Sequence, residues 1–465
     1  MKRTLGIGVA FLFLFACFPV PAQSVQTELP ALKDVFAEDF SFGCLLSYRH
    51  IALPDDVPVP GASPRALNPE GGKLIAHHMN FMAPGNNMKP MYTLDIAASA
   101  EASQKARRGK KLEIAETQPV VRFPPDLIAQ LDWAKRHGFG FRAHTLVWHS
   151  QTPTEFFRTG YTSDGTYVSR DIMTKRMEWY IKEIIRQLHE GWPGMVQAVD
   201  VVNEAIDDRS GKVRRSKNDW FIVYGDERYV SYAFEFARKY STGYGESQMK
   251  LYYNDYNTHS AGKADGIVAL LEPIYRAGNL DGIGMQEHDN ILSPTAEAWV
   301  ASYDKFDAIC NEMAITEIDV STSAKTNYPS ALILEQQANQ YASLFKLFLE
   351  RSARSGRGKI VNVSKDGLND EYTFVVNQSS SLWDTNFQAK PAYFALVDLT
   401  AAWKELNRLI DRAEEATRTE TDVQRLKVLQ EALFEAKKSR DGLYSAGNSA
   451  VAGLQGAVAL LKAAL

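Results

Sequence analysis

Two apolar runs of this sequence end in a glutamate. Residues 199–205 read Val-Asp-Val-Val-Asn-Glu-Ala, and residues 313–320 read Met-Ala-Ile-Thr-Glu-Ile-Asp-Val. Either run alone could be an ordinary strand whose last residue happens to be acidic. If both are parallel strands, their C-terminal ends bring Glu204 and Glu317 to the same edge of a sheet. Two carboxylates held together in this way are the minimum required to hydrolyse a glycosidic bond.

The elements that would position these glutamates alternate along the chain. Segments 126–137, 170–189, 229–240 and 331–351 have apolar residues at three- and four-residue spacing, as amphipathic helices do. The predicted strands cover residues 40–45, 77–82, 141–148, 198–203, 250–253, 283–286, 314–318 and 360–363. Eight strands alternating with helices predict an α/β fold with a parallel sheet, which closes most simply into a (β/α)8 TIM barrel.

Polar side chains gather where several of these strands end. Residues 142–149 read Arg-Ala-His-Thr-Leu-Val-Trp-His, residues 252–257 read Tyr-Tyr-Asn-Asp-Tyr-Asn, and residues 284–288 read Gly-Met-Gln-Glu-His. A barrel needs no such residues there for stability, and this end is where barrel enzymes place their active sites. We therefore expect these segments to surround Glu204 and Glu317.

With these motifs, the sequence resembles glycoside hydrolase family 10, the endo-β-1,4-xylanase family. The matching motifs are His-Thr-Leu-Val-Trp-His (144–149), Asp-Val-Val-Asn-Glu-Ala (200–205), Tyr-Asn-Asp-Tyr-Asn (253–257), Gly-Ile-Gly-Met-Gln-Glu-His (282–288) and Thr-Glu-Ile-Asp (316–319). They occur in the order of the family, and the resemblance covers roughly residues 32–403.

The resemblance implies a role for each matching residue. Glu204 would be the general acid/base and Glu317 the nucleophile of a retaining mechanism. His288 and Asp319 would form a hydrogen-bonded chain that keeps the nucleophile charged, and Asn203 would bind the 2-hydroxyl of the sugar. Further sugar-binding positions would be Asn86, Lys89, His144, Trp148 and Gln286. For Trp148 the alternative is packing in the core.

Three positions depart from the pattern of the family. Gly85 stands where the family has a glutamate in its Glu-Asn-x-Met-Lys segment. Asp366 and Phe374 align with two tryptophans that cover the subsites next to the catalytic pair. We expect these changes to alter how sugars are held while the catalytic pair is retained.

Length, composition and net charge limit the kinds of molecule that the chain is expected to bind. The chain has 465 residues, 45% of them hydrophobic, which is enough for one large domain or for two to three smaller ones. Its net charge of -4 gives no electrostatic case for a nucleic-acid partner. The expected partner is instead xylan or a xylo-oligosaccharide.

The first 22 residues have the pattern of a secretory signal peptide. Met1 to Arg3 supply positive charge, residues 5–20 are almost wholly apolar, and Val-Pro-Ala (20–22) offers a cleavage site. The predicted location is therefore extracellular or periplasmic, with no transmembrane segment in the mature protein. Cys17 lies in a Leu-Phe-Ala-Cys sequence that resembles a lipoprotein cleavage site, so a surface lipoprotein is the alternative.

The remaining cysteines and the histidines give no sign of a metal site. Whether Cys44 and Cys310 pair cannot be read from the sequence. His77 and His78 are adjacent, and neighbours in a strand point to opposite faces. No metal or other cofactor is therefore expected.

Two segments interrupt the alternating pattern. Residues 54–72 are rich in proline and glycine, and residues 97–117 carry the basic run Lys-Ala-Arg-Arg-Gly-Lys-Lys (105–111). We interpret the basic run as part of a solvated loop, with a binding patch as the alternative.

The chain after residue 403 has a different composition. It contains no proline and no strand-like run, and its Leu, Ile and Ala residues fall at helical spacing. Turns near 417–421 and 442–448 divide it into three helices, which predicts a small bundle. This segment, 404–465, resembles the three-helix FIVAR repeats that serve as spacers in bacterial glycosidases, so we expect a spacer or surface attachment.

The sequence thus predicts a catalytic barrel over residues 30–403 and, as its function, a secreted retaining endo-β-1,4-xylanase. The alternatives are a related β-glycosidase with shifted subsite specificity, for decorated xylan or short oligosaccharides, and a non-catalytic polysaccharide-binding barrel. Joint retention of Glu204, Glu317, Asn203, His288 and Asp319 favours an enzyme over the binding protein.

Overall fold

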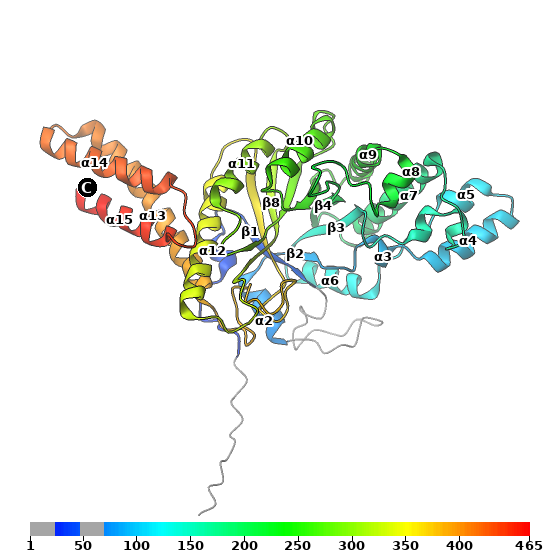
Figure 1. Cartoon of the computed structure of the whole chain (residues 1–465), viewed down its shortest axis with the longest axis horizontal. Helices are drawn as coiled ribbons and strands as arrows, with labels where there is room; N and C mark the ends of the chain where they lie inside the picture. Colours follow the sequence, from blue (N-terminus) through cyan, green and yellow to red (C-terminus); the bar gives the residue numbers. More distant parts are fainter. Residues whose placement is uncertain (1–23, 47–68) are drawn as a thin grey trace, which may run out of the picture.

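A closed ring of eight parallel strands forms the centre of the computed structural model, which describes residues 24–46 and 69–465 (Figure 1). Neighbours pair in the order β6-β5-β4-β3-β2-β1-β9-β8, and pairing of β6 with β8 closes the ring. The strands are β1 (Ser41–Leu46), β2 (Phe81–Pro84), β3 (Gly140–Trp148), β4 (Val196–Asn203), β5 (Lys250–Tyr256), β6 (Gly282–Gln286), the short β7 (His288–Asn290), β8 (Glu312–Ser321) and β9 (Lys359–Asp366). The predicted (β/α)8 barrel is confirmed.

Helices surround the ring and extend from it on two sides (Figure 1). They are α1 (Leu32–Val35), α2 (Pro69–His78), α3 (Pro90–Thr93), α4 (Ile96–Arg108), α5 (Leu112–Thr117), α6 (Pro125–Arg136), η2 (Thr154–Phe157), η3 (Thr159–Tyr161), α7 (Arg170–Gly191), α8 (Asp219–Tyr224), α9 (Arg228–Gly243), α10 (Ala261–Arg276), α11 (Ala296–Phe306), α12 (Ala331–Ser352), α13 (Pro391–Thr419), α14 (Val423–Asp441) and α15 (Ala450–Ala464).

The strands are apolar because they are covered on both faces. All four residues of β2 are buried, and in β8 only Glu312 is partly exposed. Strands β1 and β2 approach each other so closely that a Cβ atom at Gly43 would lie 2.3 Å from the carbonyl oxygen of Phe81. Glycine is therefore required at this position.

The long helices follow the predicted periodicity. Helix α7 begins after Ser169, whose side chain accepts a hydrogen bond from the N–H of Ile172. The face that packs against the barrel consists of residues three or four apart, among them Met173, Met177, Ile181, Ile184 and Leu188.

One local prediction is wrong and another is partly wrong. The strand predicted at 77–82 begins only at Phe81, because His77 and His78 end helix α2, where the His78 ring packs 4.9 Å from that of Trp383. The basic run 105–111 is exposed as expected but is only partly a loop, because residues 105–108 end helix α4 and only residues 109–111 separate it from α5. Asp95 caps α4 by accepting from the N–H of Ala98, and its basic residues favour the last turn because exposed carbonyls gather there.

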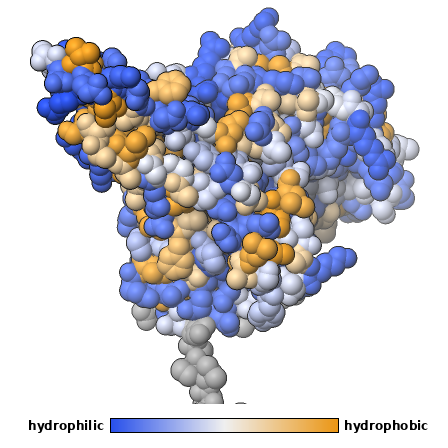
Figure 2. All heavy atoms as spheres, turned by 60° about the vertical axis from the view of Figure 1, so that its left-hand side comes forward, coloured by the Kyte–Doolittle hydropathy of each residue, from blue (hydrophilic) through white to orange (hydrophobic). Residues whose placement is uncertain are grey.

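The predicted three C-terminal helices are confirmed as α13, α14 and α15. Helix α13 is continuous from Pro391 to Thr419, so the expected domain boundary at 403 falls within one helix. Figure 2 shows apolar side chains on these projecting helices, where Val423, Phe434 and Leu460 are exposed.

Some predictions concern residues that the structure does not describe. The signal peptide with Cys17 lies outside the described residues, as does most of segment 54–72, of which 69–72 begin helix α2. Within the described part of the chain, no helix is long and apolar enough to cross a membrane. Cys44 and Cys310 are both buried and carry free thiols.

Candidate active site

Glu204 and Glu317 line the same cavity, which has a volume of about 780 Å³. Glu204 directly follows β4 in the left-handed region, with φ of 54°, and its N–H donates to the carbonyl of Asn254 at 2.8 Å. Glu317 lies within β8, where the pairing with β9 shifts register between Ile315 and Ile318. Two strands that are not neighbours in the ring therefore deliver the two carboxyl groups to one space.

Three side-chain N–H groups hold the carboxyl group of Glu204. The indole of Trp148 donates to Oε2 at 2.9 Å, while the amides of Asn203 and Gln286 donate to Oε1 at 3.1 and 3.2 Å. Burial, followed by the negative charge of Asp255, raises the pKa of Glu204 to about 7 against the effect of the hydrogen bonds from Gln286 and Trp148. Glu204 can therefore hold a proton at mildly acidic pH.

Glu317 has the opposite electrostatic environment. Burial alone would raise its pKa, but a hydrogen bond from His288 and the positive charges of His144, His288 and Arg142 lower it to about 2. The Nε2 atom of His288 lies 3.4 Å from Oε2 of Glu317. Glu317 is consequently ionised at the pH values where Glu204 is protonated.

The short strand β7 positions His288. His288 pairs in register with Asp319 of β8, and its Nδ1 donates to Asp319 Oδ2 at 2.9 Å. Burial disfavours charge on the imidazole, yet the hydrogen bonds to Asp319 and Glu317 raise the pKa of His288 well above its usual value. The chain from Asp319 through His288 to Glu317 therefore has the arrangement that the family resemblance implies.

A second layer of buried polar groups lies beneath the pair. Asp200 of β4 accepts from Nδ1 of His144 at 2.7 Å and forms an ion pair with Arg142, whose Nη2 also donates to the carbonyl of Thr316 at 3.1 Å. Asn254 donates to Oδ1 of Asn203 at 3.0 Å. These contacts fix the orientation of the side chains that reach the cavity.

Together these groups can carry out acid-assisted nucleophilic substitution. One carboxyl group is protonated and the other ionised within one partly enclosed space, and each is oriented by hydrogen bonds. Pairs of titratable groups whose environments push their pKa values apart mark the acid and the nucleophile in such sites.

Comparison with known families agrees with this chemistry. Residues 31–399 match the sequence profile described as glycosyl hydrolase family 10. The chain belongs to this family.

Relatives found by sequence and by structure include xylanases. The chain is 30% identical over 394 residues to endo-1,4-beta-xylanase Y of Acetivibrio thermocellus and 33% identical over 382 residues to endo-1,4-beta-xylanase A of Thermotoga maritima. These matches cover 81% and 80% of this chain but only 33% and 31% of the relatives, so the chain spans about a third of their length. In structure it is similar to the CBM22-1 and GH10 modules of Clostridium thermocellum xylanase 10B complexed with xylohexaose, with a TM-score of 0.68, 30% identity and coverage of 79% of this chain and 67% of that one.

The sugar-binding positions expected for family 10 all line the cavity. Lys89 donates to Asn86 Oδ1 at 2.9 Å, and its ammonium lies 4.8 Å from the centre of the Trp148 ring. Trp148 is only partly buried and reaches both Lys89 and Glu204, so core packing does not account for it. The full set is Asn86, Lys89, His144, Trp148 and Gln286.

The three positions that depart from family 10 lie in the same cavity. Asp366 is buried, its Oδ2 accepts from the N–H of Phe374 at 2.5 Å and from Thr373 Oγ1 at 3.3 Å, and burial raises its pKa to about 6. The Phe374 ring is 76% exposed and lies 5.2 Å from that of His288. At Gly85 a Cβ atom would lie 3.5 Å from the Leu46 carbonyl oxygen, its nearest neighbour among the residues that the structure describes, so a Cβ atom fits there.

Sequence reasoning missed several residues that line the cavity, including Tyr256, Glu371 and Thr373. Tyr256 is held between Lys263, whose ammonium lies 3.6 Å from the ring centre, and Arg214, whose Nη2 donates to its hydroxyl at 3.2 Å. It belongs to the 253–257 motif, which could have indicated that Tyr256 lines the cavity. Glu371 and Thr373 come from the long loop after β9, where the sequence shows no periodicity.

Proposed function

We propose that this protein is a retaining endo-β-1,4-xylanase that hydrolyses internal bonds of xylan. The observation that carries the proposal is the pair of carboxyl groups in one cavity whose pKa values lie near 7 for Glu204 and near 2 for Glu317. The names of the relatives support xylan as the substrate, and the xylohexaose bound to the xylanase 10B modules supports a chain of xylose units as ligand.

In the first step Glu204 donates its proton to the glycosidic oxygen while Glu317 attacks the anomeric carbon. The bond between that carbon and the leaving oxygen breaks, and a covalent glycosyl ester of Glu317 forms. Glu204 is left as a carboxylate.

In the second step the Glu204 carboxylate removes a proton from water, which attacks the same carbon. The ester bond breaks, Glu317 recovers its charge and Glu204 is protonated again. Two inversions at one carbon retain its configuration.

The neighbouring residues support this cycle. Asp319 and His288 hold Glu317 in its ionised form, which keeps it nucleophilic. The amide of Asn203 contacts Glu204 and lines the cavity, where it is suited to bind the 2-hydroxyl next to the reacting carbon. That hydrogen bond would strengthen as positive charge develops on the sugar.

The proposal is tested by reducing-sugar release from xylan, with cellulose and mannan for comparison. Glu317→Gln should lower kcat on xylan by about 10³-fold or more, since the nucleophile is lost. Glu204→Gln should lower it by about 10²- to 10⁴-fold on xylan, but much less on an aryl xyloside whose leaving group needs no proton. Glu312→Gln, on the same strand β8 but at its opposite end, is the matched control.

Two outcomes would overturn the assignment. Substantial xylan hydrolysis by Glu317→Gln would exclude it as the nucleophile, and inverted product anomers in an NMR time course would exclude retention. Binding of xylan without hydrolysis by the unmodified chain would favour the non-catalytic alternative.

A shifted subsite preference is the second candidate, and Gly85, Asp366 and Phe374 favour it. Gly85→Glu should restore the sugar contact that the glutamate makes in family 10. The added charged hydrogen bond should raise kcat/KM on short unbranched xylo-oligosaccharides by about fivefold or more. Gly85→Ala controls for the loss of glycine. If neither variant changes kcat/KM, this position does not determine the preference.

Secretion is part of the proposal and rests on the pattern of residues 1–22. Expression of the full chain in a bacterial host, followed by determination of the N-terminus of the exported protein, tests it. Cleavage after Ala22 is expected, and a mature chain that still begins at Met1 would contradict it.

A further inference from the structure

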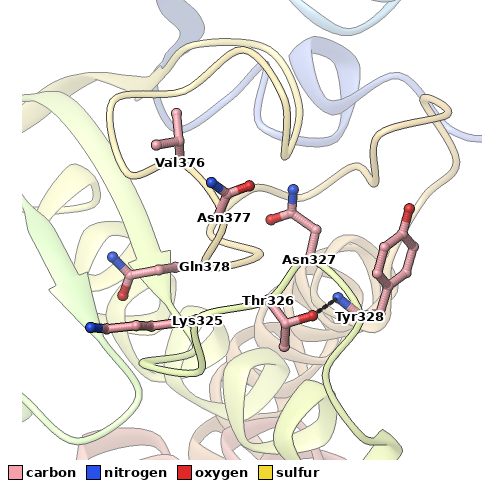
Figure 3. Close-up of a pocket in the computed structure, with 7 residues that line it drawn as sticks. All are labelled: Lys325, Thr326, Asn327, Tyr328, Val376, Asn377 and Gln378. Carbon is pink, nitrogen blue, oxygen red and sulfur yellow. Dashed lines mark hydrogen bonds between the residues drawn. The ribbon is translucent and has the colours of Figure 1, made fainter.

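A second cavity, with a volume of about 570 Å³, adjoins the cavity that contains the two glutamates (Figure 3). Residues 325–328, between β8 and α12, form one wall, and residues 376–378, between β9 and α13, form the other. Val376 lines both cavities. A ligand in the main cavity could therefore extend a side group across Val376 into the second one.

Hydrogen bonds attach the wall 376–378 to the end of β8 and its neighbour Ser379 to Asn327 of the other wall. Ser321 donates to Oε1 of Gln378 at 2.8 Å, and Thr322 donates to the Gln378 carbonyl through both its N–H and its hydroxyl, at 3.0 and 2.7 Å. Asn327 accepts from the N–H of Ser379 at 3.2 Å. The loop after β9 is thus fixed to the end of β8.

The polar groups of the second cavity are suited to a negatively charged group. Lys325 is the only charged residue that lines it, and within residues 24–46 and 69–465 its ammonium has neither an ion pair nor a hydrogen bond. Because Oε1 of Gln378 already accepts from Ser321, its amide N–H groups remain as donors. Figure 3 shows the Lys325 and Gln378 side chains extending to the same side of the cavity. A cation beside an amide donor is complementary to a carboxylate.

The main cavity, in contrast, contains more carboxyl groups than cationic groups. Glu317, Asp366 and Glu371 line it together with Lys89 and His288, so a second carboxylate there would meet negative charges close to the reacting carbon. A ligand with both a neutral sugar backbone and an acidic branch would place the backbone among these acids and the branch outside them. Tyr328, whose ring is 83% exposed, adds an apolar face of the kind that sugar rings pack against.

We propose that the second cavity binds the carboxylate of a uronic acid branch carried by the sugar chain that is cleaved in the main cavity. Lys325 supplies the charge and Gln378 the neighbouring donor. This inference rests on the proposed xylanase function and deepens it, since it names acidic branched xylan as the preferred substrate.

The test compares kcat/KM on three substrates of equal backbone length. These are a uronic acid-branched xylo-oligosaccharide, the same compound with its carboxyl group reduced to an alcohol, and the unbranched chain. Lys325→Gln should lower kcat/KM on the acidic substrate by about fivefold, the upper range for an exposed ion pair, and leave the other two within about twofold. Added salt should weaken the preference of the unmodified protein for the acidic substrate.

Lys438→Gln is the matched control, because it removes one exposed positive charge from α14 in the C-terminal helices. Equal losses on all three substrates with Lys325→Gln, or no loss on any, would overturn the proposal while leaving the xylanase function intact. Failure of the unmodified protein to hydrolyse any of the three would overturn both.

Discussion

At the scale of single residues, the environments of Glu204 and Glu317 shift their pKa values in opposite directions. Asp255 illustrates this point, because its charge raises the pKa of Glu204 although, in the part of the chain that the structure describes, the two side chains are not hydrogen-bonded to each other. The expected pH profile of kcat/KM follows from these shifts. Activity should fall above pH 7 as Glu204 loses its proton, and below about pH 2 as Glu317 gains one, provided that the chain stays folded.

Trp148 offers a test of the basic limb of this profile. Its indole N–H donates to Glu204, and this hydrogen bond lowers the pKa of Glu204. Trp148→Phe removes the donor and should therefore move the basic limb above pH 7, while the acidic limb stays in place. The measurement is kcat/KM against pH on an unbranched xylo-oligosaccharide. A limb that moves to lower pH, or stays where it was, would show that another group controls it.

Three residues of the main cavity could be placed together from the sequence, because each lies where an apolar run gives way to polar residues. Glu204 directly follows β4, His288 begins β7, and Glu317 lies inside β8, where polar residues interrupt the apolar run. Residues whose partners lie far away in the sequence show no such change in the sequence pattern. Asp200 appeared to be part of a strand, and its contacts with Arg142 and His144 depend on the register between β3 and β4.

At the scale of elements, the loop between β9 and α13 depends on one buried ion pair. The Lys390 ammonium, at the start of α13, lies 3.1 Å from Asp370 Oδ2 and donates to the carbonyl and the hydroxyl of Ser379, both at 2.7 Å. Asp370 also accepts from the N–H of Ser381 at 2.8 Å. This cluster holds the loop that contributes Thr373 and Phe374 to the main cavity.

Removing one partner of this ion pair should destabilise the folded protein. Asp370→Ala leaves the Lys390 cation buried without its counterion, and the free energy of unfolding should fall by about 3 to 5 kcal/mol. Asp370→Ala combined with Lys390→Met removes both charges and should recover part of that loss. Urea denaturation of the two single variants and the double variant gives the coupling energy. Additive losses would contradict the interpretation.

The elements themselves were largely predictable from periodicity. Strand-like runs and amphipathic segments predicted seven of the eight strands of the ring, only the first two residues of β2, and the long helices α6, α7, α9 and α12. The prediction at His77 was wrong because His78 packs on Trp383, a residue far away in the sequence. The prediction for the basic run was partly wrong because Asp95 caps helix α4, whose last turn contains basic residues. The continuity of α13 was also missed, because the change in composition at 403 lies inside one helix.

At the scale of the whole molecule, the C-terminal helices are attached to the barrel at several places. Helix α13 continues directly from it, and the linker between α14 and α15 contacts α12 of the barrel. Ser343 donates to the carbonyl of Tyr444 at 2.5 Å, and Lys346 donates to that of Gly442 at 2.9 Å. A freely moving spacer would need no such further attachment, so we expect these helices to brace the barrel.

Deleting residues 420–465 tests this expectation. Helices α14 and α15 pack on α13, where Leu406, Leu409, Ile410 and Ala413 are buried, so their removal would expose apolar surface. The melting temperature should fall by more than about 5 °C. Because none of the deleted residues lines either cavity of the barrel, kcat/KM on xylan at 25 °C should stay within about twofold.

Comparing two deletions of different length shows whether the C-terminal helices stabilise the barrel or form a separate module. Deletion after Trp403, at the boundary expected from composition, also removes half of α13, including Leu406, which is fully buried. It should therefore destabilise the barrel more than deletion after Thr419 does. Equal melting temperatures for the full chain and both shortened chains would mean that the barrel is stable without the helices, and the spacer role would then be favoured. A loss of kcat/KM in shortened chains that remain folded would instead place the helices in contact with the polysaccharide.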